Sequence, residues 1–173
     1  MDLKSMIRNV QDFPKKGIGF KDITTLVKNG PAFREVVDRI CSHFEDKKID
    51  SVLGIEARGF ILAGAIAYKK GLGMIPVRKP KKLPAKTIRE EYSLEYGSDA
   101  IEIHADAIQP GQNILVVDDL LATGGTVRAA CNLVEKAGGK VAGIAFLIEL
   151  DFLNGRSKLK EYEVLSLIHF EGE

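Results

Sequence analysis

Short apolar runs alternate with helix-like stretches through the centre of the chain. Residues 51–56 and 74–77 are apolar runs, and residues 60–70 between them form an apolar, helix-like stretch. Gly71 and Gly73 follow that stretch, and glycine commonly ends helices because it adopts the left-handed conformation easily. The pattern predicts a strand, a helix and a second strand in that order.

The same alternation returns nearer the C-terminus. Residues 113–117 are an apolar strand, Gly124-Gly125 opens a helix that runs to about residue 137, and Gly138-Gly139 ends it. Residues 141–148 and 164–168 have strand character. Short apolar strands that alternate with helices indicate a parallel sheet covered on both faces. We therefore predict an α/β fold, with a mainly parallel twisted sheet flanked by helices.

Two regions depart from this rhythm. Residues 10–30 are irregular and rich in Gly, Pro and Lys, which suggests a cap over one end of the sheet, within about residues 1–30. Residues 79–103 begin inside the cationic stretch RKPKKLPAK and continue into YSLEYGSDAIEIHAD. The second stretch alternates apolar and polar residues around Gly97-Ser98, which is typical of an antiparallel hairpin. We expect this hairpin to project from the sheet as a flexible lid.

Length, composition and charge narrow the class of protein. The 173 residues, 45% of them hydrophobic, suit one domain with a single core over residues 1–173. Because 25 basic residues nearly balance 24 acidic ones, the net charge of +1 argues against a general nucleic-acid binder.

The chain also has the character of a cytoplasmic protein. It contains no apolar run of roughly 18 residues that could span a membrane, and no signal-peptide core. Cys41 and Cys131 lie far apart, and Cys131 falls on the apolar side of a predicted helix. Buried free thiols are the expected state, which fits a reducing compartment.

Two adjacent carboxylates stand at the end of a predicted strand. Asp118 and Asp119 directly follow the apolar run 114–117, and open parallel sheets bind ligands beyond the carboxyl ends of their strands. Neighbouring carboxylates repel each other, so a structural reason for the pair is hard to find. They could accept hydrogen bonds from the vicinal hydroxyls of a sugar and stabilise positive charge that develops nearby.

A glycine-containing loop follows the carboxylates and enters the next helix. Glycine allows close approach of the backbone to an anion, and a helix N-terminus offers unpaired N–H groups. The stretch lacks the Gly-Lys-Ser/Thr of a nucleotide P-loop and the glycine spacing of a dinucleotide site. A plain strand–loop–helix turn is the alternative, but the whole segment ILVVDDLLATGGT favours a ribose 5-phosphate site. Its loop residues are Ala122, Thr123, Gly124, Gly125 and Thr126.

A second anion site is expected at another strand end. Arg58, in the segment EARGF, is placed to meet an anion at the N-terminus of the helix that follows. Arg78, Lys79 and Lys82 add positive charge after the next strand. Together the two sites describe a ribose with phosphate at one end and pyrophosphate at the other. Mg²⁺ would accompany such a substrate and be held mainly by its oxygens, so no protein metal cluster is expected.

The chain resembles a known enzyme family along nearly its whole length. ILVVDDLLATGGT resembles the phosphoribosyl-pyrophosphate motif of type I phosphoribosyltransferases. GIGFKDITTL, EARGF, RKPKKLP and YSLEYG, in this order, resemble the adenine-specific members. The resemblance implies the type I phosphoribosyltransferase fold and a homodimer. It implies a purine-salvage reaction in which adenine and phosphoribosyl pyrophosphate give AMP and pyrophosphate.

The resemblance also implies roles around the sugar. Asp118 and Asp119 would bind the ribose hydroxyls, and residues 122–126 would bind the 5′-phosphate. The pyrophosphate would contact cationic positions, and one further arginine would reach the site of a neighbouring subunit. These cationic residues are Arg58, Lys79 and Lys82 at the pyrophosphate, and Arg78 toward the neighbouring subunit.

For the base, the resemblance implies contacts from the cap and the lid. Phe20 would pack on the purine, and backbone groups at Gly19 and Lys21 would read its edge. Glu95 would act as the acid/base residue when N9 attacks, with Tyr96 beside it in the substrate site. Relative to the family it resembles, the chain has Gly19 where larger apolar residues are frequent and Lys21 where arginine is frequent, and recognition through the backbone would tolerate both differences.

Two alternatives stay open. The acceptor could be another base, such as hypoxanthine, guanine, xanthine or orotate. The chain could instead be a regulator that senses phosphoribosyl pyrophosphate and binds nucleic acid, although such proteins usually carry a DNA-binding domain or a basic face.

Overall fold

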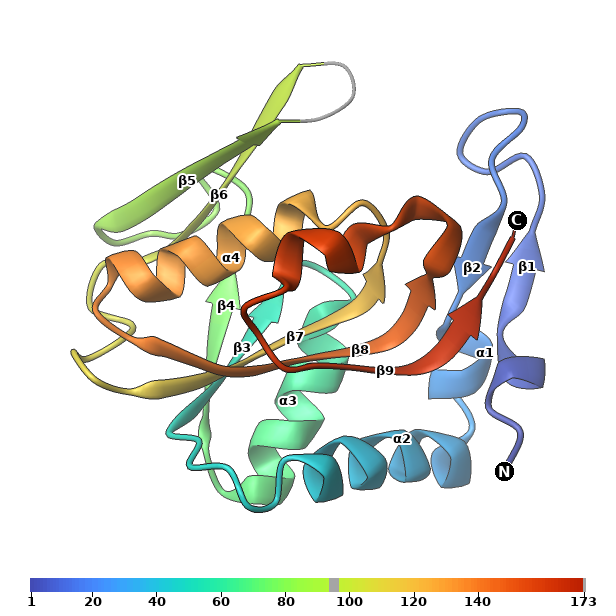
Figure 1. Cartoon of the computed structure of the whole chain (residues 1–173), viewed down its shortest axis with the longest axis horizontal. Coiled ribbons are helices and arrows are strands. Elements are labelled where there is room, and N and C mark those ends of the chain that lie inside the picture. Colours follow the sequence, from blue (N-terminus) through green and yellow to red (C-terminus); the bar gives the residue numbers. More distant parts are fainter. Residues whose placement is uncertain (94–96, 173) are drawn as a thin grey trace.

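The computed structural model describes residues 1–93 and 97–172. Its centre is a five-stranded sheet in the order β4-β3-β7-β8-β9, and every neighbouring pair is parallel. The predicted parallel sheet is therefore confirmed (Figure 1). Its strands are β3 (Ser51–Ile55), β4 (Gly73–Val77), β7 (Asn113–Leu121), β8 (Lys140–Leu150) and β9 (Val164–Phe170).

Helices cover both faces of the sheet. Helices α2 (Gly30–His43) and α3 (Gly59–Lys70) lie on one face, and α4 (Gly125–Lys136) lies on the other (Figure 1). Along β7, Leu115 and Val117 pack into the cluster with α2 and α3, whereas Ile114 and Val116 pack into the cluster with α4. Because successive side chains of a strand point to opposite faces, a strand covered on both sides reads as a continuous apolar run.

The helix ends follow the glycine signals, but one helix was missed. Gly71 ends α3 with φ of 65°, and Gly138 follows α4 with φ of 85°. No element was predicted for residues 30–43, where α2 forms. Its start carries a recognisable signal, because the Asn29 side chain accepts a hydrogen bond from the Ala32 N–H at 3.1 Å.

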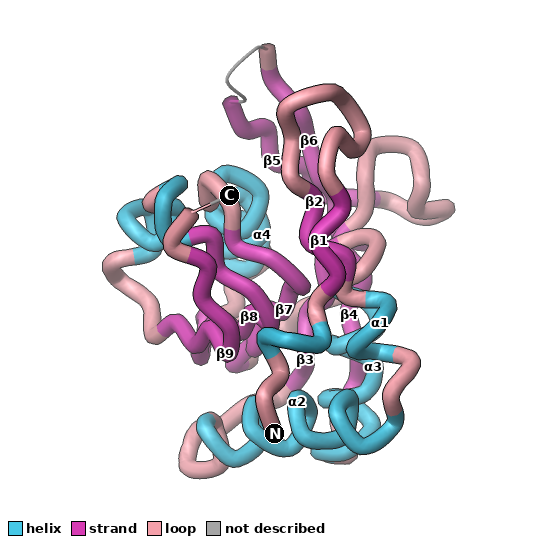
Figure 2. The backbone as a smooth tube through the Cα atoms, turned by 90° about the vertical axis from the view of Figure 1, so that its right-hand side faces the viewer, coloured by secondary structure: helices cyan, strands magenta, loops and turns pink. Residues whose placement is uncertain are grey.

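The N-terminal segment is more ordered than expected. Strands β1 (Arg8–Val10) and β2 (Phe20–Asp22) pair antiparallel, and the short helix α1 (Thr24–Val27) follows. The prediction of an irregular stretch over residues 10–30 was therefore wrong for β2 and α1. Figure 2 shows this small sheet standing beside the main one, and Figure 1 places it near the carboxyl end of β9.

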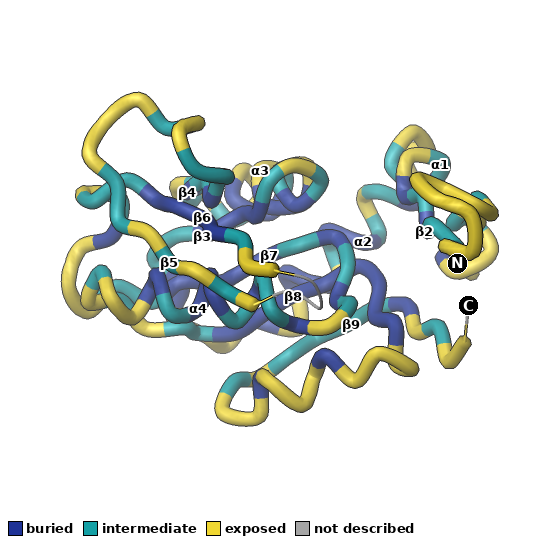
Figure 3. The backbone as a smooth tube through the Cα atoms, turned by 90° about the horizontal axis from the view of Figure 1, so that it is seen from above, coloured by how far each residue is buried: buried dark blue, intermediate teal, exposed yellow. Residues whose placement is uncertain are grey.

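The predicted hairpin is present as β5 (Thr87–Ser93) and β6 (Ser98–His104). Its register pairs Ser93 with Ser98, in agreement with a turn around Gly97-Ser98. The hairpin projects from the sheet and passes over α4, and much of β5 is exposed (Figures 1 and 3). Glu90 fixes it to α4 by accepting a hydrogen bond from Asn132 at 2.8 Å and pairing with Lys136.

The sequence also predicted the absence of a membrane-spanning segment and the presence of free cysteines. Within residues 1–93 and 97–172, no helix combines the length and apolar character needed to cross a membrane. Cys41 and Cys131 are both free and buried, and burial raises the pKa of the Cys131 thiol to about 12.

Candidate active site

Strand β7 carries the carboxylate pair, and it continues further than predicted. The expected end at residue 117 holds only on one side, where the pairing with β3 stops at Val117. On the other side β7 remains paired with β8 as far as Leu121. Because β3 ends at Ile55, Asp118 and Asp119 have a strand neighbour only on the β8 side.

Asp118 lies against the beginning of α3. Its Oδ1 accepts a hydrogen bond from the Asp119 N–H at 2.9 Å. A Cβ atom on Gly59 would lie only 2.8 Å from the same oxygen, so residue 59 must be glycine for the carboxylate to sit there. The glycine of EARGF thus makes room for Asp118.

Asp119 is buried and forms an ion pair with the half-buried Arg58. Only 5% of the residue is exposed, and its Oδ2 lies 2.9 Å from Nε of Arg58. The N–H does not point at this oxygen, so Oδ2 accepts no hydrogen bond within the part of the chain that the structure describes. A buried acceptor without a donor is costly unless a ligand supplies one, which makes this atom a candidate contact for a hydroxyl group or a cation.

The electrostatics of the pair favour a cationic partner. Burial raises the pKa of both carboxyls, and the charge of Asp119 raises that of Asp118 further. Arg58 opposes the increase at Asp119 through its positive charge. Two carboxylates held together away from water therefore gain from any positive charge that develops beside them.

The predicted phosphate loop (residues 122–126) encloses a small cavity of about 80 Å³. Gly124 caps α4 in the left-handed conformation, with φ of 79°, and Gly125 is the first helical residue. The first N–H groups of the helix have no partner within it, and they face the same end as the loop. The cavity is lined by Asp118, Leu120, Leu121, Ala122, Thr123, Gly124, Gly125, Thr126 and Val127.

Arg58 joins the carboxylate pair to the N-terminal segment. Its guanidinium group stacks over the Phe20 ring, 4.7 Å from the centroid, and its Nη1 donates to the carbonyl of Lys21 at 3.5 Å. Arg58 was predicted to meet an anion at the start of α3, and it does lie at the N-cap of that helix. In this structure its charge partner is Asp119.

A second cavity, of about 370 Å³, opens beside Phe20. Phe13 packs edge-on against Phe20 with the ring centroids 5.1 Å apart, so one wall is aromatic. The sequence analysis missed Phe13, Asp22 and Thr24, since only the family resemblance pointed to this segment. The lining residues are Val10, Phe13, Phe20, Asp22, Thr24 and Arg58.

The structure also locates the two backbone positions predicted to read the base. Gly19 directly precedes β2, and a Cβ there would come no closer than 3.6 Å to another atom. The Lys21 side chain is buried, with Nζ donating to Asn9 at 3.1 Å and lying 4.6 Å from the Phe170 ring centroid. A Cβ atom at position 19 would thus be accommodated.

The cationic residues after β4 are held by acidic partners. Oε2 of Glu56 accepts hydrogen bonds from Nε of Arg78 at 3.1 Å and from the Lys79 N–H at 3.0 Å. Burial would raise the pKa of Glu56, but these donors and the positive charges of Arg78 and Lys82 lower it. Glu56 therefore connects the loop after β3 to the loop after β4.

Lys79 also reaches the hairpin. Its ammonium group pairs with Asp99 and donates to the Tyr92 hydroxyl at 3.1 Å. Lys82 is exposed, and its carbonyl accepts from Arg78 at 3.5 Å. Two further predicted site residues, Glu95 and Tyr96, lie outside the residues that the structure describes.

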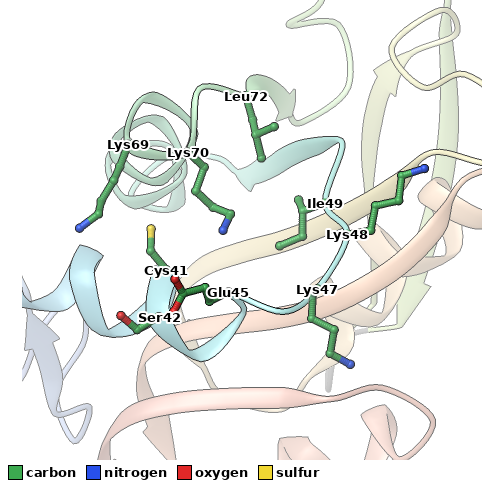
Figure 4. Close-up of a pocket in the computed structure, with 9 residues that line it drawn as sticks. All are labelled: Cys41, Ser42, Glu45, Lys47, Lys48, Ile49, Lys69, Lys70 and Leu72. Atoms are coloured by element: carbon green, nitrogen blue, oxygen red, sulfur yellow. The ribbon is translucent and has the colours of Figure 1, made fainter.

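A larger cavity lies away from all of these residues. It has a volume of about 620 Å³ and is lined by the ends of α2 and α3, with Cys41, Glu45 and four lysines around it (Figure 4). None of the predicted site residues that the structure describes lines it. The chemistry predicted from the sequence thus gathers at the carboxyl ends of β3, β4 and β7, beside the N-terminal segment.

Comparison with known proteins identifies the family. The family profile described as "Phosphoribosyl transferase domain" matches residues 23–171. An adenine phosphoribosyltransferase from Chloroflexus aurantiacus is 60% identical, with 98% of both chains covered. The crystal structure of adenine phosphoribosyltransferase from Thermoanaerobacter pseudethanolicus matches with a TM-score of 0.95, at 52% identity and 98% coverage of both chains. The Saccharomyces cerevisiae enzyme, crystallised with an imino-altritol bisphosphate and adenine, matches with a TM-score of 0.90, at 39% identity and 96% coverage of both. This chain belongs to the adenine phosphoribosyltransferases, within the phosphoribosyl transferase domain family.

Proposed function

We propose that the chain performs the reaction of its family in purine salvage, the transfer of a 5-phosphoribosyl group from phosphoribosyl pyrophosphate to adenine, giving AMP and pyrophosphate. The observation that carries this proposal is the connection from Asp119 through Arg58 to Phe20. It joins a carboxylate beside the phosphate loop to the aromatic cavity beside Phe20, of about 370 Å³, which is the proposed base cavity. Sugar, phosphate and base can therefore occupy one continuous site.

The proposed roles follow from the chemistry of each part. Asp118 and Asp119 bind the ribose hydroxyls and stabilise the positive charge that C1 develops as pyrophosphate departs. The loop 122–126 holds the 5′-phosphate on the N-terminus of α4. Phe20 packs on adenine, and backbone groups at Gly19 and Lys21 contact its edge. The pyrophosphate meets Arg58, Lys79 and Lys82 on the opposite side of the sugar.

Mg²⁺ is the proposed cofactor. The two carboxylates fit a hard cation that prefers oxygen ligands, and the Oδ2 of Asp119, which accepts no hydrogen bond from the described residues, offers one such oxygen. When bound with the substrate, the ion would neutralise charge on the departing pyrophosphate. Removal of divalent ions with a chelator should abolish turnover, and added Mg²⁺ should restore it.

Glu95 is the proposed acid/base residue, and Tyr96 is proposed to line the substrate site beside it. Replacing Glu95 by Gln should lower kcat by at least about a hundredfold if the carboxylate handles the purine proton. Glu91→Gln is the matched control, because Glu91 is an exposed residue of β5 that only pairs with Arg89. An unchanged kcat in Glu95→Gln would leave positioning of the base as the only role for the hairpin.

A homodimer is also proposed, and the outer face of α3 supports it. Ile61 is 41% exposed and Tyr68 is 91% exposed, at helical spacing on either side of the half-buried Ala65. Phe33 and Val37 of α2 continue this apolar surface along a cavity of about 540 Å³. Contiguous exposed apolar surface of this kind commonly marks a protein interface. The partner's active site would then receive Arg78.

We also propose a cytoplasmic location. Both cysteines are buried free thiols, a state that a reducing compartment preserves.

The choice of acceptor base is tested by a direct assay. The protein is incubated with phosphoribosyl pyrophosphate, Mg²⁺ and, separately, adenine, hypoxanthine, guanine, xanthine or orotate. We expect AMP from adenine and no comparable product from the other bases. Formation of IMP or GMP without AMP would overturn the adenine assignment, and binding without turnover for every base would favour a sensor.

A further inference from the structure

The phosphate loop touches a second turn from a distant part of the sequence. Gly155 starts the short 3-10 helix η3 (Gly155–Leu159), just after η2 (Asp151–Leu153), and it is buried. A Cβ atom at position 155 would lie 2.2 Å from the carbonyl oxygen of Ala122 and 3.0 Å from the nitrogen of Gly124. These distances are too short for any side chain, so the two backbones are in direct contact.

The contact is reciprocal. A Cβ atom on Gly124 would lie 2.5 Å from the carbonyl oxygen of Gly155, in addition to the strain of a positive φ at that position. Two glycines thus face each other across the contact. The path of the phosphate loop between Ala122 and Gly124 is therefore limited by where Gly155 lies.

An ion pair between an exposed arginine and a buried glutamate fixes the turn that carries Gly155. The next residue, Arg156, binds Glu149 with two hydrogen bonds, from Nε to Oε1 at 3.0 Å and from Nη2 to Oε2 at 2.5 Å. Glu149 is only 5% exposed, and it lies in β8 directly opposite Leu121, the residue before the phosphate loop. Glu149 therefore lies beside the strand end that leads into the phosphate loop and also holds the turn that touches this loop.

The remaining donors of Arg156 reach across to β9. Nη1 donates to the carbonyl of Val164 at 3.0 Å, and Nη2 to the hydroxyl of Ser166 at 3.3 Å. The far end of η3 is held by Leu159, which is 1% exposed in the core cluster under α4. Both ends of the turn are thus tied to the fold.

We propose that Gly155, held by the Glu149–Arg156 ion pair, is a positioning residue that sets the shape of the phosphate loop and so the affinity for the substrate's 5′-phosphate. The inference rests on the proposed function, because it requires the loop 122–126 to bind that phosphate. Gly155 and Arg156 touch no substrate themselves. They act through the backbone of Ala122 and Gly124.

The direct test is Gly155→Ala, with Gly172→Ala as the matched control. A Cβ at Gly172 meets no atom within 4 Å, so that substitution adds the same methyl group in open space. Displacement of the loop by about 1 Å should raise the Kd for ribose 5-phosphate and the KM for phosphoribosyl pyrophosphate by at least about tenfold. The KM for adenine should stay within about twofold of the unsubstituted enzyme, since neither Gly155 nor the phosphate loop lines the cavity beside Phe20.

A second variant tests the ion pair, and it decides the matter if Gly155→Ala does not fold. Arg156→Gln leaves the buried Glu149 without its cation and should weaken ribose 5-phosphate binding several-fold. The double variant Glu149→Gln with Arg156→Gln removes the unpaired charge and should recover part of the affinity. Folded variants with unchanged affinity for ribose 5-phosphate would overturn the positioning role.

A parallel variant separates this inference from the proposed function. Thr123→Ala with Thr126→Ala removes two hydroxyl donors from the loop and should weaken ribose 5-phosphate binding about tenfold. If the threonine variant loses affinity and folded Gly155→Ala does not, the positioning role is wrong and the phosphate site stands. If neither variant loses affinity, the assignment of the phosphate site is wrong as well.

Discussion

At the scale of single residues, the carboxylate pair shows a conflict between stability and function. Asp118 is held beside Asp119 and against Gly59, and burial and the neighbouring charge both raise its pKa. Ionising both carboxyls therefore destabilises the folded, ligand-free protein. The same arrangement is useful when a positive charge appears in the ligand.

Asp118→Asn should consequently separate the two effects. Because the amide carries no charge, we expect kcat to fall by about a hundredfold while the fold is kept. The melting temperature in the absence of ligand should rise. Steady-state kinetics and thermal melts measure the two quantities, with Asp106→Asn, an exposed carboxylate beyond β6, as the control. Near-normal turnover would contradict the ribose role.

The stability gain should also depend on pH. A carboxyl whose pKa is raised on folding contributes stability in its neutral form, which is complete below about pH 4 and is lost as pH rises through the raised native value. The gain from Asp118→Asn should therefore be present at pH 7 and absent near pH 4. Denaturant titrations at the two pH values check this, and an equal gain at both would contradict it.

What the sequence could not provide at this scale is the direction of each side chain. The adjacent aspartates and the glycine loop were recognisable from their types and spacing. That one carboxylate lies on Gly59 and the other on Arg58 follows from the strand continuing past Val117, which no local pattern shows. The contact between Gly155 and Ala122 joins positions more than thirty residues apart and left no sequence signal.

At the scale of elements, Asp22 organises the N-terminal segment beside the base cavity. Its carboxylate accepts a hydrogen bond at 2.9 Å from the N–H of Thr24, the first residue of α1. It accepts another from the Arg8 side chain of β1. The backbone donor first, and then Arg8, lowers the pKa of this carboxyl to about 2. One ionised side chain thus holds β1, β2 and α1 together.

Asp22→Asn should destabilise the protein by about 1–2 kcal/mol at neutral pH, because the shift from 3.8 to about 2 measures how strongly folding favours the charged form. A lowered native pKa contributes stability above the unfolded value and loses it as pH falls. The difference between the two proteins should therefore shrink between pH 4 and pH 2. Denaturant titrations over this range, with Asp46→Asn as an exposed control, test the prediction. A difference independent of pH would contradict it.

The positions of some helices and strands could be predicted from the sequence more closely than those of others. Strands β3, β4, β8 and β9 are covered on both faces or packed on a core, and their apolar runs gave positions close to the observed ones. Helix α2 was missed, although its apolar stripe at Val36, Val37 and Ile40 is buried. The short β2 and α1 depend on contacts with distant residues, so local pattern could not define them.

At the scale of the whole molecule, the apolar face of α3 predicts the state of assembly. Tyr68→Glu with Ile61→Lys places charges on the most exposed part of that face. We expect the mass in solution to fall from that of a dimer to that of a monomer. Activity should fall with it if the partner's site depends on Arg78. Light scattering after size exclusion measures the mass, and Lys140→Glu at the exposed start of β8 is the control. A monomeric unsubstituted protein would contradict the homodimer.

The Phe170 ring lies near the end of the chain, yet it contacts the beginning. The ammonium groups of Lys4 and Lys21 lie 4.8 Å and 4.6 Å from its centroid, and Lys21 follows Phe20 of the base cavity. On a ribosome, β1 and β2 are synthesised long before this aromatic ring emerges. The N-terminal segment therefore lacks its contact with Phe170 until β9 has been synthesised. Nascent chains stalled before β9 should therefore not bind adenine in the proposed cavity beside Phe20, and adenine binding should arise only once β9 has been translated.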